Sequence, residues 1–173
     1  MSDALVTDNT RPTDPVGRVL DGISRLFAIC SGLMLTAMAL MSVYSIIGRS
    51  FFGKPLMGDY ELVQMMSAVA VTMALPFCQM MRGHIIVDFF TARNSPRTNA
   101  VLDLIAALLL SVCAFALAWR VTIATFDFTK NHDASMLLSL PTWWGYAPMG
   151  PSFFLLGCAG LYTAWQHARE IGA

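Results

Sequence analysis

Four long stretches of the sequence consist almost entirely of apolar and uncharged residues. They extend over residues 26–48, 62–81, 104–126 and 143–165, and Arg120 is the one Asp, Glu, Lys or Arg among them. The hydrocarbon core of a bilayer is about 30 Å thick, so a helix with a rise of about 1.5 Å per residue needs about 20 residues to cross it. The pattern therefore predicts an all-α integral membrane protein with four transmembrane helices.

A different pattern precedes the first stretch. Asp14 and Pro15 are residue types that favour a helix start, as N-cap and as first helical residue. Apolar and charged residues then alternate at helical spacing: Val16, Val19, Leu20, Ile23 and Phe27 on one face, and Arg18, Asp21 and Arg25 on the other. The segment is either an amphipathic helix along the membrane surface or an extension of the first span into water. Residues 1–12 are expected to be a disordered cytoplasmic tail, and residues 13–173 a single four-helix membrane domain.

The composition agrees with a membrane location and argues against several classes of function. Only 13% of the residues are charged, against about 25% in an average soluble domain. Eleven basic residues balance eleven acidic ones, so no electrostatic argument favours nucleic acid as a partner. The segments between the spans are too short for an extramembrane catalytic domain, so the function is expected in the helices and their ends.

The distribution of Lys and Arg predicts the orientation. With four spans, the N-terminal segment, the loop between the second and third spans and the C-terminal tail share one side of the membrane. Seven of the eleven Lys and Arg residues lie on that side, and the other four are Arg49, Lys54, Arg120 and Lys130. Because basic residues are enriched in cytoplasmic loops, both termini are predicted to be cytoplasmic.

The ionisable residues give little support to a catalytic, metal or haem site. No Asp, Glu or Lys lies in the middle of a span, where ion-coupled carriers usually keep such groups. His84 and Asp88 are four residues apart and could share a helix face, but two ligands do not make a metal site. The histidines lie at or beyond the ends of the spans, and the four cysteines are interpreted as small apolar packing residues. No catalytic residue and no cofactor is expected.

One face of the second span carries small and polar residues over its whole height. At 100° per residue this stripe comprises Glu61, Gln64, Ala68, Thr72, Leu75, Gln79 and Arg82. In lipid, such residues favour contact with protein, because they allow close approach and hydrogen bonding. The stripe is predicted either to pack inside this chain's own bundle or to dock on a partner. Shorter sets of small residues occur in the first span (Gly32, Thr36, Ala39) and in the fourth (Gly157, Gly160, Ala164).

Three motifs in a fixed order suggest a family. RSFFGKPL (residues 49–56) stands before Tyr60-Glu61-Leu62, RGHIIVD (82–88) follows the second span, and LPTWWGYAPMG (140–150) opens the fourth. In motifs, spacing and span number, the chain resembles the small, Q-type membrane subunit of tripartite ATP-independent periplasmic (TRAP) transporters.

The resemblance implies a complex in the bacterial inner membrane with a large multi-helix membrane subunit and a periplasmic substrate-binding protein. The large subunit would carry the solute, typically an organic acid, and the coupling sodium ions, while this chain braces it as a scaffold. By match to the motifs, the positions of interest are Arg49, Glu61, Arg82, His84, Asp88, Pro141, Trp143 and Pro148. Arg49 and Glu61 end adjacent spans on one side, so they are expected to join these helix ends to each other or to the partner.

Two alternatives remain open on the sequence. The first is a stand-alone four-helix membrane protein, such as a redox or haem-linked anchor, which purification without a large partner or a visible haem spectrum would indicate. The second is a small carrier that acts alone as a homodimer, although it would lack the buried carboxylate that such carriers usually need.

Overall fold

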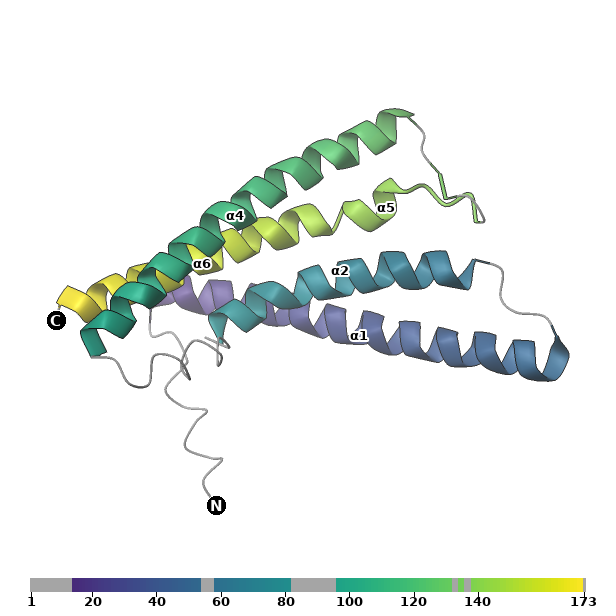
Figure 1. Cartoon of the computed structure of the whole chain (residues 1–173), viewed down its shortest axis with the longest axis horizontal. Coiled ribbons are helices and arrows are strands. Elements are labelled where there is room, and N and C mark those ends of the chain that lie inside the picture. Colours follow the sequence, from purple (N-terminus) through teal and green to yellow (C-terminus); the bar gives the residue numbers. More distant parts are fainter. Residues whose placement is uncertain (1–13, 54–57, 82–95, 132–133, 136–137, 173) are drawn as a thin grey trace, which may run out of the picture.

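The computed structural model describes residues 14–53, 58–81, 96–131, 134–135 and 138–172 of the 173-residue chain. Within these residues the chain forms five helices (Figure 1): α1 (Pro15–Phe52), α2 (Asp59–Met80), α4 (Pro96–Asn131), α5 (Trp143–Tyr146) and α6 (Met149–Gly172). The described residues form no strand, and one isolated antiparallel bridge joins Ala134 to Pro141. The prediction of an all-α protein is confirmed.

Three helices of the described part are long and apolar enough to cross a membrane, judged by length and composition. They are Pro15–Phe51, Asp59–Met80 and Val101–Asn131. The predicted fourth span is instead two helices, α5 and α6. Pro148 lies between them and has no N–H to donate to the helical hydrogen-bond ladder. The 24 residues of α6 make a helix about 36 Å long, enough to cross a bilayer. Much of α6 is buried against other helices, with small and polar residues such as Ser152, Ala159 and Thr163 among its buried positions.

The first helix settles the two alternatives for the segment before the first span. α1 begins at Pro15, with Asp14 in an extended conformation as N-cap, and continues without a break for 38 residues. The segment is thus an extension of the first span. Its Leu20 packs against a buried cluster of Met80, Ala159 and Tyr162 from α2 and α6. The helix ends where Gly53 takes a left-handed conformation with φ of 63°, which favours glycine because it has no Cβ.

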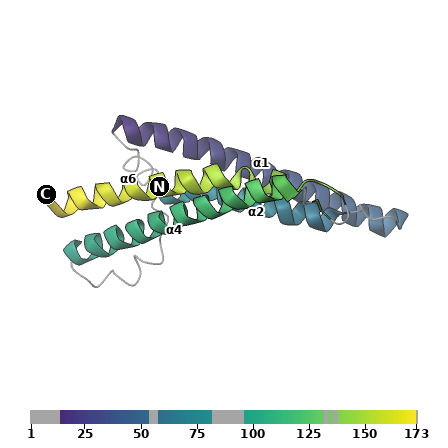
Figure 2. The same ribbon diagram turned by 90° about the horizontal axis from the view of Figure 1, so that it is seen from above.

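The long helices are arranged as two antiparallel hairpins (Figures 1 and 2). α1 pairs with α2, α4 pairs with α6, and the hairpins meet where α2 contacts α6. The start of α1 and the end of α6 lie at one end of the bundle, called here the terminal end. The opposite end, called the loop end, holds the start of α2, the end of α4 and α5, and there the hairpins diverge in Figure 1.

Small residues allow the helices to pack closely within each hairpin. In α1, Ser24, Ser31 and Ser45 are buried at multiples of seven residues, a spacing that keeps them on one face. The hydroxyl of Ser31 donates to the carbonyl oxygen of Ala70 on α2 at 2.6 Å. The hydroxyl of Ser45 donates to the carboxylate of Asp59 at 2.6 Å. Asp59 therefore ties the start of α2 to α1.

The contact between α4 and α6 depends on glycine. Ser111 on α4 donates a hydrogen bond of 2.9 Å to the carbonyl oxygen of Gly157 on α6. A Cβ atom on Gly157 would lie 2.9 Å from the ring of Phe115, and one on Gly160 would lie 3.2 Å from Cβ of Ser111. Larger residues at these two positions would force α4 and α6 apart or displace the ring.

Candidate functional site

The polar stripe of α2 divides into two parts. At the terminal end, the side chain of Gln79 is 4% exposed, and its Nε2 donates to Oγ1 of Thr163 on α6 at 2.9 Å. At the loop end, Glu61, Gln64 and Ala68 line a cleft between α2 and the α5–α6 segment. Of the two alternatives for the stripe, packing within the bundle thus holds for Gln79, while Gln64 and Ala68 stay exposed.

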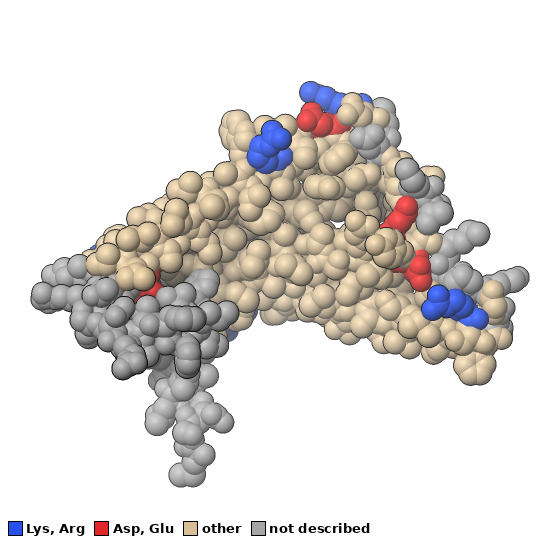
Figure 3. Space-filling model, in the orientation of Figure 1, with Lys and Arg blue, Asp and Glu red and all other residues tan. Residues whose placement is uncertain are grey.

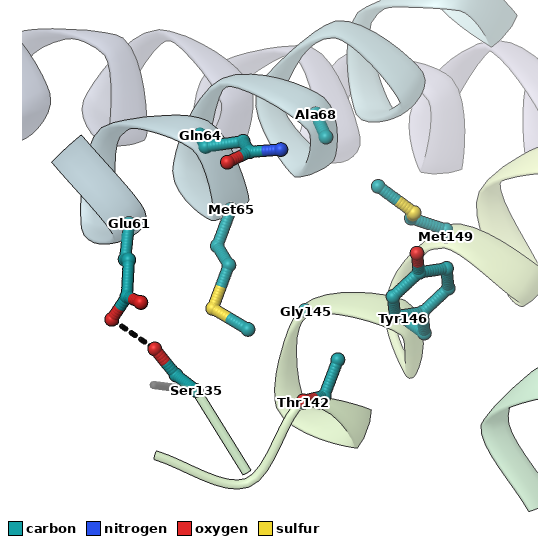
Figure 4. A pocket seen from close by; sticks show the side chains of 9 residues that line it. All are labelled: Glu61, Gln64, Met65, Ala68, Ser135, Thr142, Gly145, Tyr146 and Met149. Atoms are coloured by element: carbon teal, nitrogen blue, oxygen red, sulfur yellow. Dashed lines mark hydrogen bonds between the residues drawn. The ribbon is translucent and has the colours of Figure 1, made fainter. Parts of the chain in front are cut away.

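The cleft has a volume of about 300 Å³ and walls from both hairpins (Figure 4). It is lined by Glu61, Gln64, Met65 and Ala68 on one side and by Ser135, Thr142, Gly145, Tyr146 and Met149 on the other. Polar groups and methionine side chains therefore share one space.

A set of contacts, called here the clasp, joins the two walls of this cleft at one side. The carboxylate of Glu61 accepts hydrogen bonds from the hydroxyl of Ser135 and from the backbone N–H of Leu138, the latter at 3.3 Å. Gly58 precedes α2 with φ of 80°, and any Cβ there would collide with the side chain of Leu138. The clasp thus holds the segment before α5 on the first turn of α2, where a negative charge also favours the helix dipole.

The segment that Glu61 holds is itself closed by backbone contacts. The N–H of Ser135 donates to the carbonyl oxygen of Leu140 at 2.8 Å, and Ala134 pairs with Pro141 in the isolated bridge. Pro141 therefore ends the segment, one residue before the N-cap of α5.

The expected contact between Arg49 and Glu61 within the chain is not formed. Arg49 is exposed, and the one salt bridge among the residues described joins Arg25 to Asp21 within α1. Positions 59 and 61 lie about 200° apart around a helix, so when Asp59 faces α1, Glu61 faces the other hairpin. Within the chain, Ser45 and Asp59 join the ends of α1 and α2 instead; a contact of Arg49 or Glu61 with a partner stays a prediction.

The remaining positions and segments singled out in the sequence lie in several places. Thr72 hydrogen-bonds to carbonyl oxygens of its own helix at Ala68 and Val69, at 3.0 Å and 2.8 Å. Trp143 begins α5, half-exposed, with its ring edge-on to that of Trp144. Arg82, His84 and Asp88, and the tail over residues 1–12, lie outside the described residues.

A second hollow is a groove of about 630 Å³ between α4 and the start of α6. Its lining is almost wholly apolar: Phe115, Ala118, Trp119, Thr122, Ile123, Phe126, Gly150, Pro151 and Phe154. Among the residues that the structure describes, no group of three His, Cys, Asp or Glu side chains could hold a metal ion.

Comparison with protein families decides the relationship. The family model for tripartite ATP-independent periplasmic transporters, DctQ component, matches residues 38–170, which is most of the chain. The chain belongs to the DctQ family. Neither the curated proteins nor the solved structures compared with it gave a match. The match begins within α1 and includes the cleft, the clasp, α2, α4, α5 and nearly all of α6.

Membership in the DctQ family confirms the resemblance found in the motifs. The chain is the small component of a TRAP transporter and a membrane protein, and its family is a transporter component and not a family of enzymes. The family functions in a tripartite system with a large membrane subunit and a periplasmic binding protein.

Proposed function

We propose that this DctQ chain is the scaffold subunit of a solute uptake system in the bacterial inner membrane. It braces a large permease subunit that carries the solute and the coupling sodium ions, while a periplasmic binding protein delivers the solute. The solute is an organic acid. Both termini are cytoplasmic, and the loop end with its cleft faces the periplasm.

The observation that carries this proposal is that α2 is bound to its neighbours along its whole length. Ser31 of α1 holds it at Ala70, Thr163 of α6 holds it at Gln79, and Ser135 holds it at Glu61. A part that must stay fixed while its partner moves needs such cross-linking, because each contact resists sliding between helices. The close packing of α4 on Gly157 and Gly160 has the same effect.

The outer surface supports docking in the membrane. Only 6% of the most apolar stretch of α1 is fully buried inside the chain, so the side of this helix that faces away from α2 is available to lipid or to another protein. Most of the face in Figure 3 carries neither acidic nor basic side chains. Asp59 and Glu61 lie in the first turn of α2, at its loop end, so a site for sodium or a carboxylate at membrane depth is expected on the partner.

Reconstitution tests the proposal. The large subunit and the binding protein are placed in liposomes with a sodium gradient, with and without this chain, and uptake of labelled organic acids is measured. We expect uptake only when all three proteins are present. Uptake by this chain without the large subunit, or full uptake by the large subunit without this chain, would contradict a bracing role.

A further inference from the structure

Arg120 is the one charged residue within the four apolar stretches of the sequence, and it lies on the outer face of α4. Its side chain is exposed, and it forms no salt bridge with any residue that the structure describes. A cation that faces hydrocarbon is costly, so a long side chain of this kind extends toward the membrane–water interface. The anions present at that level of a membrane are the phosphate groups of its lipids.

The apolar groove between α4 and α6 has the depth of one leaflet of the membrane. Its lining on α4 extends from Phe126 to Phe115, about 16 Å of helix. Asp103 and Asp127 bracket the apolar part of α4, and Phe115 lies midway between them. The hydrocarbon of one leaflet is about 15 Å thick, half of a core of about 30 Å. The groove therefore extends from near the polar boundary at the loop end to the middle of the bilayer.

The shape of the groove suits a flexible hydrocarbon chain better than a helix. Trp119, Phe126 and Phe154 line it and are 70%, 64% and 57% exposed, whereas close contacts between membrane helices need small residues. The one hydroxyl in the lining, that of Thr122, already donates to the carbonyl oxygen of Ala118 at 2.7 Å. The volume of about 630 Å³ corresponds to about twenty water molecules at roughly 30 Å³ each, which is room for a chain of many methylene groups.

We propose that this groove and Arg120 together form a phospholipid site. One acyl chain fills the groove, and the guanidinium of Arg120 binds the phosphate, for which its paired N–H donors are suited. Arg120 precedes Ile123 of the lining by about one turn and lies about 60° from it around the helix, so its side chain can reach the headgroup over the edge of the groove.

The other charges at this end of α4 do not oppose such a headgroup. Asp127 and Lys130 are exposed beyond Arg120, toward the water, and their charges cancel. The order along the helix is then apolar groove, cation and polar end, which is the order of acyl chain, phosphate and water in a leaflet. The site goes beyond the proposed function, because it requires neither the large subunit nor transport.

Tryptophan fluorescence measures the binding of the acyl chain. The full chain is purified in detergent, freed of lipid and titrated with phosphatidylglycerol whose acyl chains carry bromine, which quenches an indole that it contacts. We expect saturable quenching, most of which is lost in Trp119→Phe because Trp119 lines the groove. Trp144→Phe, which removes an exposed tryptophan outside the groove, is the control. Quenching that does not saturate, or that falls equally in the two variants, would overturn the site.

Substitutions separate the two parts of the site. Arg120→Gln should weaken binding about fivefold, the share of one basic residue near lipid headgroups, and Lys130→Gln is the matched control on the same helix. Ile123→Trp narrows the groove and should weaken binding, whereas Ala116→Trp adds the same bulk outside the lining. Brominated diacylglycerol, which has the chains but no phosphate, should bind the unsubstituted chain about fivefold more weakly than phosphatidylglycerol does. Variants that bind like their controls would overturn the proposal.

Cross-linking in the cell membrane identifies the occupant. A photoactivatable amino acid replaces Ile123, cells are irradiated, and the mass of the purified chain and its peptides is measured. We expect a phospholipid adduct on the peptide that contains position 123. A cross-linked peptide from another protein or from a second copy of this chain, in place of lipid, would overturn the proposal.

Discussion

The hydroxyl of Ser135 donates a hydrogen bond to the carboxylate of Glu61, and this contact joins the two helical hairpins at one side of the cleft. The two residues are 74 positions apart in the sequence. Their contact fixes the start of α5 relative to the start of α2, which is why Glu61 belongs to the same structural unit as Thr142 and Tyr146.

The clasp is predicted to contribute measurably to stability. Glu61→Gln keeps the shape of the side chain but removes its charge, and a hydrogen bond to a charged group is worth about 1 kcal/mol more than a neutral one. We expect a fall of that size in the free energy of unfolding of the detergent-solubilised chain. Asp127→Asn, which is exposed at the end of α4, is the control.

A double-mutant cycle assigns this loss to the pair. The effects of Glu61→Gln and Ser135→Ala should be less than additive, because the first weakens and the second removes the same interaction. Additive losses, or a loss equal to that of Asp127→Asn, would show that the clasp does not hold the hairpins.

Glycine at the contact of α4 and α6 is predicted to be required for the close packing and stability of these two helices. Gly157→Ala would place Cβ 2.9 Å from Phe115, and such overpacking costs about 1–3 kcal/mol. Gly22→Ala is the matched control, because nothing lies within 4 Å of its Cβ position and alanine favours a helix by about 1 kcal/mol over glycine. Both variants gain this helix propensity, so Gly157→Ala should unfold at a lower temperature than Gly22→Ala because of the overpacking against Phe115. Equal or reversed shifts would contradict the packing described for α6.

The buried amide on α2 gives a third prediction. Gln79→Leu removes the donor to Thr163, and such bonds between membrane helices average about 0.6 kcal/mol and reach about 1.7 kcal/mol. We expect a loss in that range, at its upper end because Gln79 is buried, measured by unfolding in detergent. Thr36→Val, whose hydroxyl is exposed and bonds to its own helix, should change stability much less. If Gln79→Leu leaves the free energy of unfolding unchanged, the contact between Gln79 and Thr163 does not help to hold α2 in place.

Arg49 and topology provide a fourth prediction. Arg49 is exposed and Asn131 ends α4 at the same end of the bundle, so both should be reached from the periplasm, whereas Asn9 should not. Single cysteines at Asn9 and Asn131 are labelled with a membrane-impermeant reagent in intact cells whose outer membrane has been made permeable. Labelling of the cysteine that replaces Asn9 would show that the N-terminus faces the periplasm, opposite to the predicted orientation.

The sequence predicted the fold class and the start of α1 because both follow from local signals. The charge-free stretches mark the thickness of the bilayer and not the length of a helix, so α1 and α4 extend well beyond residues 26–48 and 104–126. The break at Pro148 was not predicted, because the surrounding residues are uncharged and continue the apolar pattern.

The candidate site was predicted only in part. Helical periodicity placed Glu61, Gln64 and Ala68 on one face, but the divergence of the hairpins, which opens the cleft at that face, is a property of tertiary packing. The role of Asp59 was missed, although the seven-residue spacing of Ser24 and Ser31, with Ser45 two intervals further on, was a signal for a buried face on α1.

The central claim is that this chain stays rigid while its partner moves the solute. Cysteines at Glu61 and Ser135, in a cysteine-free variant, can be joined by a short thiol-reactive cross-linker that replaces the clasp with a covalent bridge. Uptake is then measured in liposomes that contain the complete system, with the uncross-linked double variant as reference. A brace predicts unchanged or slightly higher uptake after cross-linking. Loss of uptake upon cross-linking, with the complex still assembled, would show that the hairpins must move and would contradict the account.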